Sequence, residues 1–288
     1  LAIILAGAYF FSHRSPSTGT PPPDQGTTPP AGGSPPQGQV DTTKTVIGAS
    51  VEKRDITAYH YGTGAKEILF AGGIHGGYSW NTALLAYELM DYLAANPSAV
   101  PANTKVTVIP VLNPDGLNKV VGTAGPFVPA DVSKSNDTVV SGRFNTNGVD
   151  LNRNFACDWQ SKGTWQNKTV SGGSAAFSEP ESLAFKNYVE AHIPAAVVVW
   201  HSAAGGVFAS NCQNGISPET RTIANAYAAA SGYKAYESFD FYEVTGDMTN
   251  WLAEKNIPAI SVLLSTHEDT EWNQNKAGIE AVLNRYAK

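Results

Sequence analysis

The segment GVDLNRNF, residues 148–155, places charged and amide side chains inside an otherwise apolar stretch. With Arg143 just upstream, it supplies two guanidinium groups, those of Arg143 and Arg153, and the neutral donor Asn152. A guanidinium group presents a rigid fork of N–H donors that matches a carboxylate, and bidentate pairing adds direction as well as energy. The segment therefore predicts a carboxylate-binding site. A structural alternative is that Asp150 and Arg153 simply pair with each other.

Two histidines follow apolar runs that are typical of buried strands. His75 follows residues 68–74 (ILFAGGI), and His201 follows residues 195–200 (AAVVVW). Ligand sites in open α/β sheets lie at the carboxyl ends of strands, and imidazole is a common zinc ligand. One strand-end histidine is more often structural. The pair, together with LNPDG at 112–116 and the arginine segment, indicates a metal-dependent site.

Seven short motifs, which include the histidine and arginine segments above, follow one another between about Lys44 and the C-terminus. They are GGIHGGYSWNT (72–82), VLNPDGL (111–117), GRFNTNGVDLNRNF (142–155), FSEPES (177–182), WHSA (200–203), YEVTGDMTNW (242–251) and IPAISVLLS (257–265). Their content and order resemble the zinc metallocarboxypeptidases of bacterial type, in the carboxypeptidase A-like family. The resemblance implies an α/β fold, a three-layer sandwich in which a mixed, mostly parallel eight-stranded sheet is flanked by helices.

The resemblance also implies a role for several residues. By it, His75 and His201 would bind zinc, Arg143 would polarise the scissile carbonyl, Asn152 and Arg153 would hold the terminal carboxylate of a peptide, and Tyr242 would close over the bound substrate. The expected partners are peptide or peptidoglycan C-termini.

Two positions depart from the family pattern. The third zinc ligand of the family is a glutamate directly before a tryptophan, and here Ser79 precedes Trp80. The general base of the family is a glutamate at the end of the strand predicted at 258–264, and here that position is Leu263, or Leu264 if the register differs by one. A catalytic zinc site uses three protein ligands and one open position for water. We therefore expect zinc binding to be weak or absent and hydrolysis to be impaired.

The segment THEDTEW, residues 266–272, could supply substitutes for the missing groups: His267, Glu268, Asp269 and Glu271. So acidic a loop is more often only solvated. Glu88 is expected to lie too far along its helix from His75 to serve. Two functions remain open, an exported metallocarboxypeptidase with altered metal ligation and a non-catalytic relative that binds peptide or cell-wall ends.

Three further residues near these motifs have two interpretations each. Asp247 could face the terminal side chain of a ligand and favour Lys, Arg or diaminopimelate, or it could cap a helix. The family resemblance places Cys157 and Cys212 in loops around one cleft. A disulfide between them would suit an oxidising compartment, and a pair of buried thiols is the alternative.

The N-terminus differs in composition from the rest of the chain. Residues 1–11 (LAIILAGAYFF) form an apolar run shorter than the roughly 20 residues that span a bilayer, so they fit a signal-peptide core or the end of a membrane anchor. Residues 12–43 are rich in Pro, Gly, Ser and Thr and predict a disordered linker, leaving 44–288 for the carboxypeptidase-like domain. We expect an exported monomer, tethered to a membrane only through the N-terminal segment.

The remaining composition and periodicity agree with a single α/β domain. The net charge of −6 comes without a basic patch, which excludes nucleic acid as an expected partner. Apolar, β-branched runs predict strands at 45–51, 68–74, 106–112, 195–200 and 258–264. Helical patterns lie at 80–95, 179–192, 218–231, 246–255 and 270–286, the second with a capping box expected at Ser178 and Glu181.

Overall fold

The computed structural model describes residues 43–287 of the chain. The predicted apolar segment at 1–11 and all of the predicted linker at 12–43 except Thr43 lie outside the described residues. Within 43–287, no helix combines the length and the apolar character needed to cross a bilayer.

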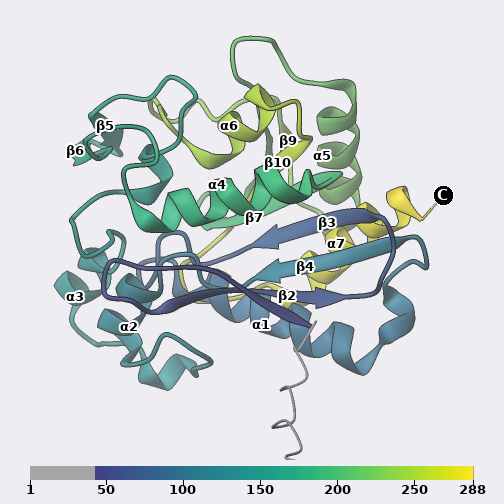
Figure 1. Ribbon diagram of the computed structural model, residues 1–288, viewed down its shortest axis with the longest axis horizontal. Coiled ribbons are helices and arrows are strands. Elements are labelled where there is room, and N and C mark those ends of the chain that lie inside the picture. Colours follow the sequence, from purple (N-terminus) through teal and green to yellow (C-terminus); the bar gives the residue numbers. More distant parts are fainter. Residues whose placement is uncertain (1–42, 288) are drawn as a thin grey trace, which may run out of the picture. The chain divides into compact units, whose positions relative to one another are not determined.

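A mixed sheet of eight strands forms the centre of the described domain (Figure 1). Four of the seven neighbouring strand pairs are parallel, namely β4–β3, β3–β7, β7–β10 and β8–β9. The other three pairs are antiparallel. The predicted fold, with its mixed and mostly parallel sheet, is confirmed. In spatial order the strands are β1 (Lys44–Ala49), β2 (Asp55–Tyr61), β4 (Thr104–Ile109), β3 (Lys66–Ala71), β7 (Ala196–Ser202), β10 (Ala259–Leu264), β8 (Gly206–Ala209) and β9 (Ala235–Tyr236).

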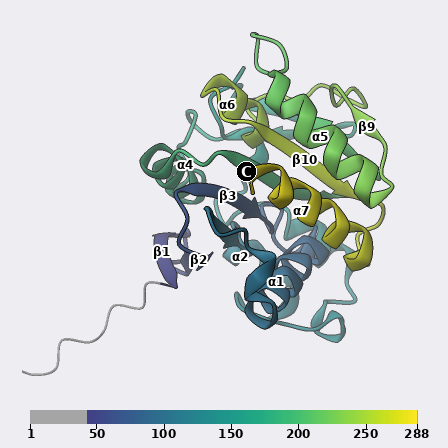
Figure 2. The same ribbon diagram turned by 90° about the vertical axis from the view of Figure 1, so that its right-hand side faces the viewer.

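Helices cover both faces of this sheet, as the turned view in Figure 2 shows. One face packs against α1 (Trp80–Ala95), α5 (Pro218–Ser231) and α7 (Trp272–Tyr286). The other packs against α4 (Pro180–His192) and α6 (Met248–Glu254). Two shorter helices, α2 (Pro114–Val121) and α3 (Asn136–Ser141), lie in the loops near the site described below.

The buried strands are apolar throughout because each contributes to two cores. Successive residues of a strand point to opposite faces of the sheet. In β3, Ile68 and Phe70 therefore join the core beneath α1, α5 and α7, whereas Leu69 and Ala71 join the core beneath α4 and α6. The same alternation in β7 and β10 decides which of their residues face the site.

The predicted strands and helices are all present, with ends that differ by at most three residues from the predicted ones. The expected capping box of α4 is wrong. The N-cap position of this helix is Glu179, whose side chain makes no capping hydrogen bond, and the Ser178 hydroxyl donates to Glu179 Oε1 at 2.8 Å instead of accepting from the helix. Glu181 is engaged elsewhere, because it accepts from Asn145 Nδ2 at 3.1 Å.

Two local features frame the site. The predicted disulfide between Cys157 and Cys212 is confirmed, and it ties the segment after the NRNF motif to the segment after β8, with Cα atoms 6.1 Å apart. An antiparallel hairpin separate from the main sheet is formed by β5 (Lys162–Trp165) and β6 (Lys168–Ser171).

Candidate functional site

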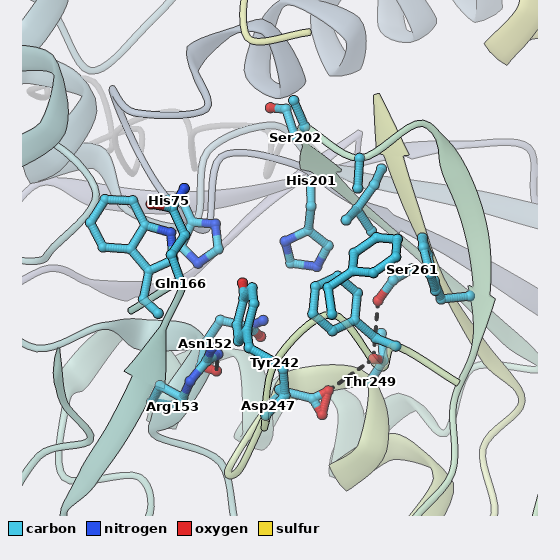
Figure 3. A pocket seen from close by; sticks show the side chains of 18 of the residues that line it. His75, Asn152, Arg153, Gln166, His201, Ser202, Tyr242, Asp247, Thr249 and Ser261 are labelled. Carbon is cyan, nitrogen blue, oxygen red and sulfur yellow. Dashed lines mark hydrogen bonds between the residues drawn. The ribbon is translucent and has the colours of Figure 1, made fainter. Parts of the chain in front are cut away.

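A pocket of about 260 Å³ lies at the carboxyl ends of β7 and β10 (Figure 3). It brings together residues that are far apart in the sequence, as expected for the carboxyl edge of an α/β sheet. Of the predicted site residues, Ser79 does not line the pocket. Those that do are His75, Arg143, Asn152, Arg153, His201, Tyr242, Asp247 and Leu263.

The two histidines face each other across this pocket, with ring centroids 5.5 Å apart. His75 Nε2 lies 3.3 Å from Asp150 Oδ1, and His75 Nδ1 has no hydrogen-bond partner among the described residues. Burial and the charge of Arg143 lower the pKa of His75 to about 4. Burial and the nearby His75 hold the pKa of His201 well below its usual value. Both rings are therefore neutral near pH 7, the form in which imidazole binds metals.

Leu263 occupies the position next to His201 on the neighbouring strand. The two residues are register partners in the parallel β7–β10 pair, and Leu263 lines the pocket. Leu264 points to the opposite face, where it is fully buried in the core that contains Trp200. Of the two candidates for the general-base position, the structure thus places Leu263 at the site.

The described residues do not fit a zinc site with three protein ligands. Ser79 is 1% exposed, and its hydroxyl has no hydrogen-bond partner among these residues. Within 43–287, the only three His, Cys, Asp or Glu side chains close enough to share an ion are Cys157, Asp158 and Cys212. The sulfur atoms of that set are joined in the disulfide and are not thiolate ligands. Two imidazoles are present without a third ligand.

Arg143, rather than Arg153, is the ion-pair partner of Asp150. Arg143 donates to Asp150 Oδ2 from Nε at 2.9 Å and from Nη2 at 2.7 Å, and both residues are buried. Burial opposes the ionisation of Asp150, but Arg143 and His75 outweigh it and hold the pKa of this carboxyl well below its usual range. The alternative interpretation of the sequence, an Asp150–Arg153 pair, is wrong.

Arg153 is fixed by main-chain carbonyl groups and keeps two donors unused by these contacts. Its Nε and Nη2 donate to Thr164 O at 3.1 and 2.6 Å, and Nη1 donates to Asn152 O at 2.6 Å. A guanidinium group has five N–H donors. The three bonds leave one N–H on each Nη atom, and such donors can bind a carboxylate. Asn152 is held beside it, because its Oδ1 accepts from Met248 N at 3.0 Å.

Tyr242 belongs to an aromatic wall of the pocket that begins beside Arg153. Its ring lies 6.0 Å from the Arg153 guanidinium carbon and 4.9 Å from the ring of Phe239. Phe208 and Phe241 continue this wall, and all four aromatic residues line the pocket.

Asp247 caps α6 and also lines the pocket. Its carboxylate accepts from Asn250 N at 3.2 Å and from Thr249 Oγ1 at 3.2 Å, and Thr249 is hydrogen-bonded in turn to Ser261 (Figure 3). Burial raises the pKa of Asp247 to about 6. The helix-cap interpretation is confirmed, and the buried carboxylate remains a candidate contact for a ligand.

The described domain matches a known protein family along almost its whole length. The zinc carboxypeptidase model matches residues 40–284, which is most of the chain. The chain belongs to the zinc carboxypeptidase family.

Individual family members match at lower coverage. The chain is 28% identical over 221 residues to gamma-D-glutamyl-L-diamino acid endopeptidase 1 of Lysinibacillus sphaericus, with 69% of the chain and 54% of that protein covered. It is 31% identical over 123 residues to human carboxypeptidase D, with 38% and 8% covered. The chain thus spans about half or less of the length of these relatives.

Solved structures at lower sequence identity share the fold. Murein-tripeptide amidase MpaA from Escherichia coli O157 superposes with a TM-score of 0.59 at 19% identity, covering 87% of this chain and 93% of that one. Bovine thrombin-activatable fibrinolysis inhibitor gives a TM-score of 0.65 at 19% identity, covering 85% and 88%.

The loop after β10 does not bring an acidic substitute into the pocket of this family member. Glu268 and Asp269 are exposed, and Glu271 accepts from Ser265 N at 2.9 Å and from the Tyr233 hydroxyl. None of the three lines the pocket, and neither does the half-buried Glu88. His267 is the one candidate of this loop that lines it.

Several pocket residues of this zinc carboxypeptidase relative were not predicted. They come from the hairpin and from the aromatic wall: Trp165, Gln166, Phe208, Phe239 and Phe241. Aromatic residues are common in cores, so their types alone do not distinguish a pocket wall from buried packing. The short alternating run KGTW, ending in a two-residue turn, was the available signal for the hairpin.

Proposed function

We propose that this zinc carboxypeptidase-family protein binds peptides by their free C-terminal carboxylate and has impaired hydrolysis. The observation that carries the proposal is the coexistence of two features in one pocket. Arg153 has two N–H donors that its contacts with the described residues leave unengaged, while Leu263 occupies the position next to His201 where the family resemblance implies a base.

The binding half of the proposal follows from charge and burial. Arg153 is 1% exposed, and its guanidinium makes no ion pair within 4.0 Å among the described residues. A carboxylate in this position would make charge-assisted hydrogen bonds away from bulk water, where they are stronger than neutral ones. Arg143, whose charge is largely balanced by Asp150, would face the neighbouring peptide group.

The second part of the proposal, impaired hydrolysis, follows from the side chains that the pocket lacks. A positioned acid or base contributes about 10²- to 10⁴-fold to a rate, or roughly 3 to 5 kcal/mol of barrier. The side chain of Leu263 cannot accept a proton, and Ser79 neither reaches the pocket lining nor carries charge. In a zinc site of the family pattern, a ligand at position 79 and a base at position 263 would act on the same step, the activation of water.

Peptidoglycan stem peptides are the ligand class that we favour. The relative from Lysinibacillus sphaericus is a gamma-D-glutamyl-L-diamino acid endopeptidase, and MpaA is a murein-tripeptide amidase. Export supports access to such ligands, and we propose it from the apolar run at 1–11, the linker composition and the disulfide.

A specific observation favours a second candidate, a weak metallopeptidase. Among the described residues, His75 Nδ1 has no hydrogen-bond partner, and the Asp150 carboxylate lies near Nε2. A carboxylate behind a histidine is the common arrangement around metal-binding imidazoles. Residual zinc binding by His75 and His201 would therefore be accompanied by residual turnover.

Calorimetric titration of paired peptides tests the proposal. A peptide with a free C-terminus and the same peptide with a C-terminal amide are compared on wild type, Arg153→Ala and Arg153→Lys. We expect at least tenfold weaker binding of the free acid by Arg153→Ala and little change for the amide, since an unpaired desolvated carboxylate costs about 2 to 5 kcal/mol. Arg153→Lys keeps the positive charge but not the forked donor group, so its affinity for the free acid should lie between those of wild type and Arg153→Ala. Equal binding of acid and amide by wild type would refute carboxylate recognition.

A further inference from the structure

The β5–β6 hairpin touches both arginines of the pocket through three consecutive residues of β5. Gly163 lies against the aliphatic part of Arg153, Thr164 O accepts from its guanidinium, and the ring of Trp165 lies under Arg143. We infer that this hairpin positions the two arginines of the pocket, and above all Arg153, which we call the carboxylate clamp. The inference rests on the proposed function for its consequence in binding, but its geometry stands independently.

The contact with Arg153 fixes the plane of its guanidinium. Thr164 O accepts from both Nε and Nη2, so one carbonyl group holds this edge of the guanidinium while Arg153 lines the pocket. Gly163 makes this approach possible. A Cβ atom at Gly163 would lie 2.8 Å from Arg153 Cδ, closer than side-chain carbons pack, and the buried arginine would have to move.

The hairpin also contacts the flat face of the second guanidinium group, that of Arg143, through the ring of Trp165. The guanidinium carbon of Arg143 lies 4.4 Å from the centre of the Trp165 ring and 5.7 Å from that of Tyr78. Trp165 and Tyr78 also pack edge to face, with centroids 5.1 Å apart. A cation over a tryptophan face is attracted by the ring, most strongly when it is desolvated. Asp150 holds the edge of Arg143, and Trp165 holds its face.

The hairpin is itself attached to the arginine segment. Asp150 N donates to Ser171 O at 3.0 Å, and Val149 and Ser171 form an isolated bridge. An isolated two-stranded hairpin is at best marginally stable in water, so these attachments decide where β5 lies. The backbone of the residue that pairs with Arg143 thus holds one end of β6, and β6 places β5 against both arginines.

Two adjacent alanine substitutions test the inference. Gly163→Ala adds a methyl group against Arg153, whereas Thr164→Ala removes a side chain but keeps the main-chain carbonyl. We expect Gly163→Ala to weaken binding of a free-acid peptide at least tenfold with the amide peptide unchanged, and Thr164→Ala to change neither. Trp165→Leu, which removes the ring from Arg143 but retains an apolar side chain, should weaken both peptides at least threefold.

A measurement without ligand keeps the inference separate from the proposed function. In protein labelled with ¹⁵N-arginine, the Nε–H signal of Arg153 should be protected from solvent exchange in wild type and Thr164→Ala and lose that protection in Gly163→Ala. An Arg153 Nε–H that exchanges rapidly in wild type, or is equally protected in a folded Gly163→Ala, overturns the inference whatever the peptides do. Should Gly163→Ala not fold, unchanged peptide binding by Trp165→Leu overturns it instead. If wild type binds the acid and amide peptides equally but Arg153 Nε–H shows the expected protection, only the proposed function is overturned.

Discussion

His201 and Leu263 are register partners on the adjacent parallel strands β7 and β10 and face the same pocket. The imidazole is buried and neutral near pH 7, and its neighbour is an aliphatic side chain that is 9% exposed. Because the register of buried strands is strongly specified, the pairing of β7 with β10 fixes these two side chains next to each other. The pocket therefore presents an imidazole and a hydrocarbon side chain side by side from two neighbouring strands.

Zinc affinity should depend on residue 79. We predict weak zinc binding by wild type through His75 and His201, and tighter binding by Ser79→Glu, because a carboxylate adds a third ligand and offsets charge. Competition with a chromophoric chelator measures the affinity. Ser79→Gln is the matched control, since it has the length of glutamate without its charge. Equal affinities for wild type and Ser79→Glu would contradict the prediction.

Turnover should need both missing carboxylates. We expect Ser79→Glu alone to leave hydrolysis of C-terminal residues near background and Ser79→Glu with Leu263→Glu to raise it. The two changes should be strongly non-additive because they act in one step. Leu264→Glu is the control for strand position: it buries a charge in the apolar core and should lower the melting temperature without restoring activity. Vigorous turnover by wild type would show that another group, with His267 the nearest candidate, serves in place of the missing ones.

Stability should depend on pH through Asp247. Its pKa is about 6 in the folded protein and 3.8 in an unfolded chain, so the folded state binds the proton more tightly and stability falls as pH rises from about 4 to about 6. Asp247→Asn keeps an acceptor for the helix cap and removes the charge. The variant should match wild type near pH 4 and exceed it by about 3 kcal/mol at pH 7, at about 1.4 kcal/mol per pKa unit. Urea denaturation at several pH values measures this difference, and parallel stability curves for the two proteins would contradict it.

The same residue should set a preference for the terminal side chain. A buried carboxylate on the pocket wall favours an amine over an alkyl group, so peptides ending in Lys should bind more tightly than peptides ending in norleucine. Asp247→Asn should bring the two affinities to within about twofold. Identical wild-type affinities for the two peptides would leave Asp247 with the helix cap as its sole role.

The sequence predicted the main sheet and helices well because their apolar periodicity is long and strong. β3, β7 and β10 are recognisable since both of their faces are buried. β2 was not predicted, although it is seven residues long. β8 and β9 were not predicted either, because strands of four and two residues carry too little pattern. The hairpin was missed for a related reason: KGTW and KTVS mix polar and apolar residues, and it is long-range contacts that place them.

The site residues were predicted individually, but their pairings were not. The spacing of Asp150, Arg143 and Arg153 in sequence allows either arginine to meet the carboxylate. The short 3₁₀ turn at Leu151–Arg153 and the hairpin carbonyl decide between them, and these depend on the tertiary fold. Likewise, sequence alone left Leu263 and Leu264 as alternatives, and the pairing of β10 with β7 separates them.

The carbonyl group of Thr164 has a consequence for how this pocket can be mapped. An alanine scan reports only what side chains contribute, so it would find position 164 silent and would register this contact through its neighbour, Gly163→Ala. The carbonyl group that orients Arg153 would leave no trace at its own position. Homologues could also vary freely at position 164 while retaining the same clamp, so the absence of a shared residue there would not indicate the absence of a shared contact.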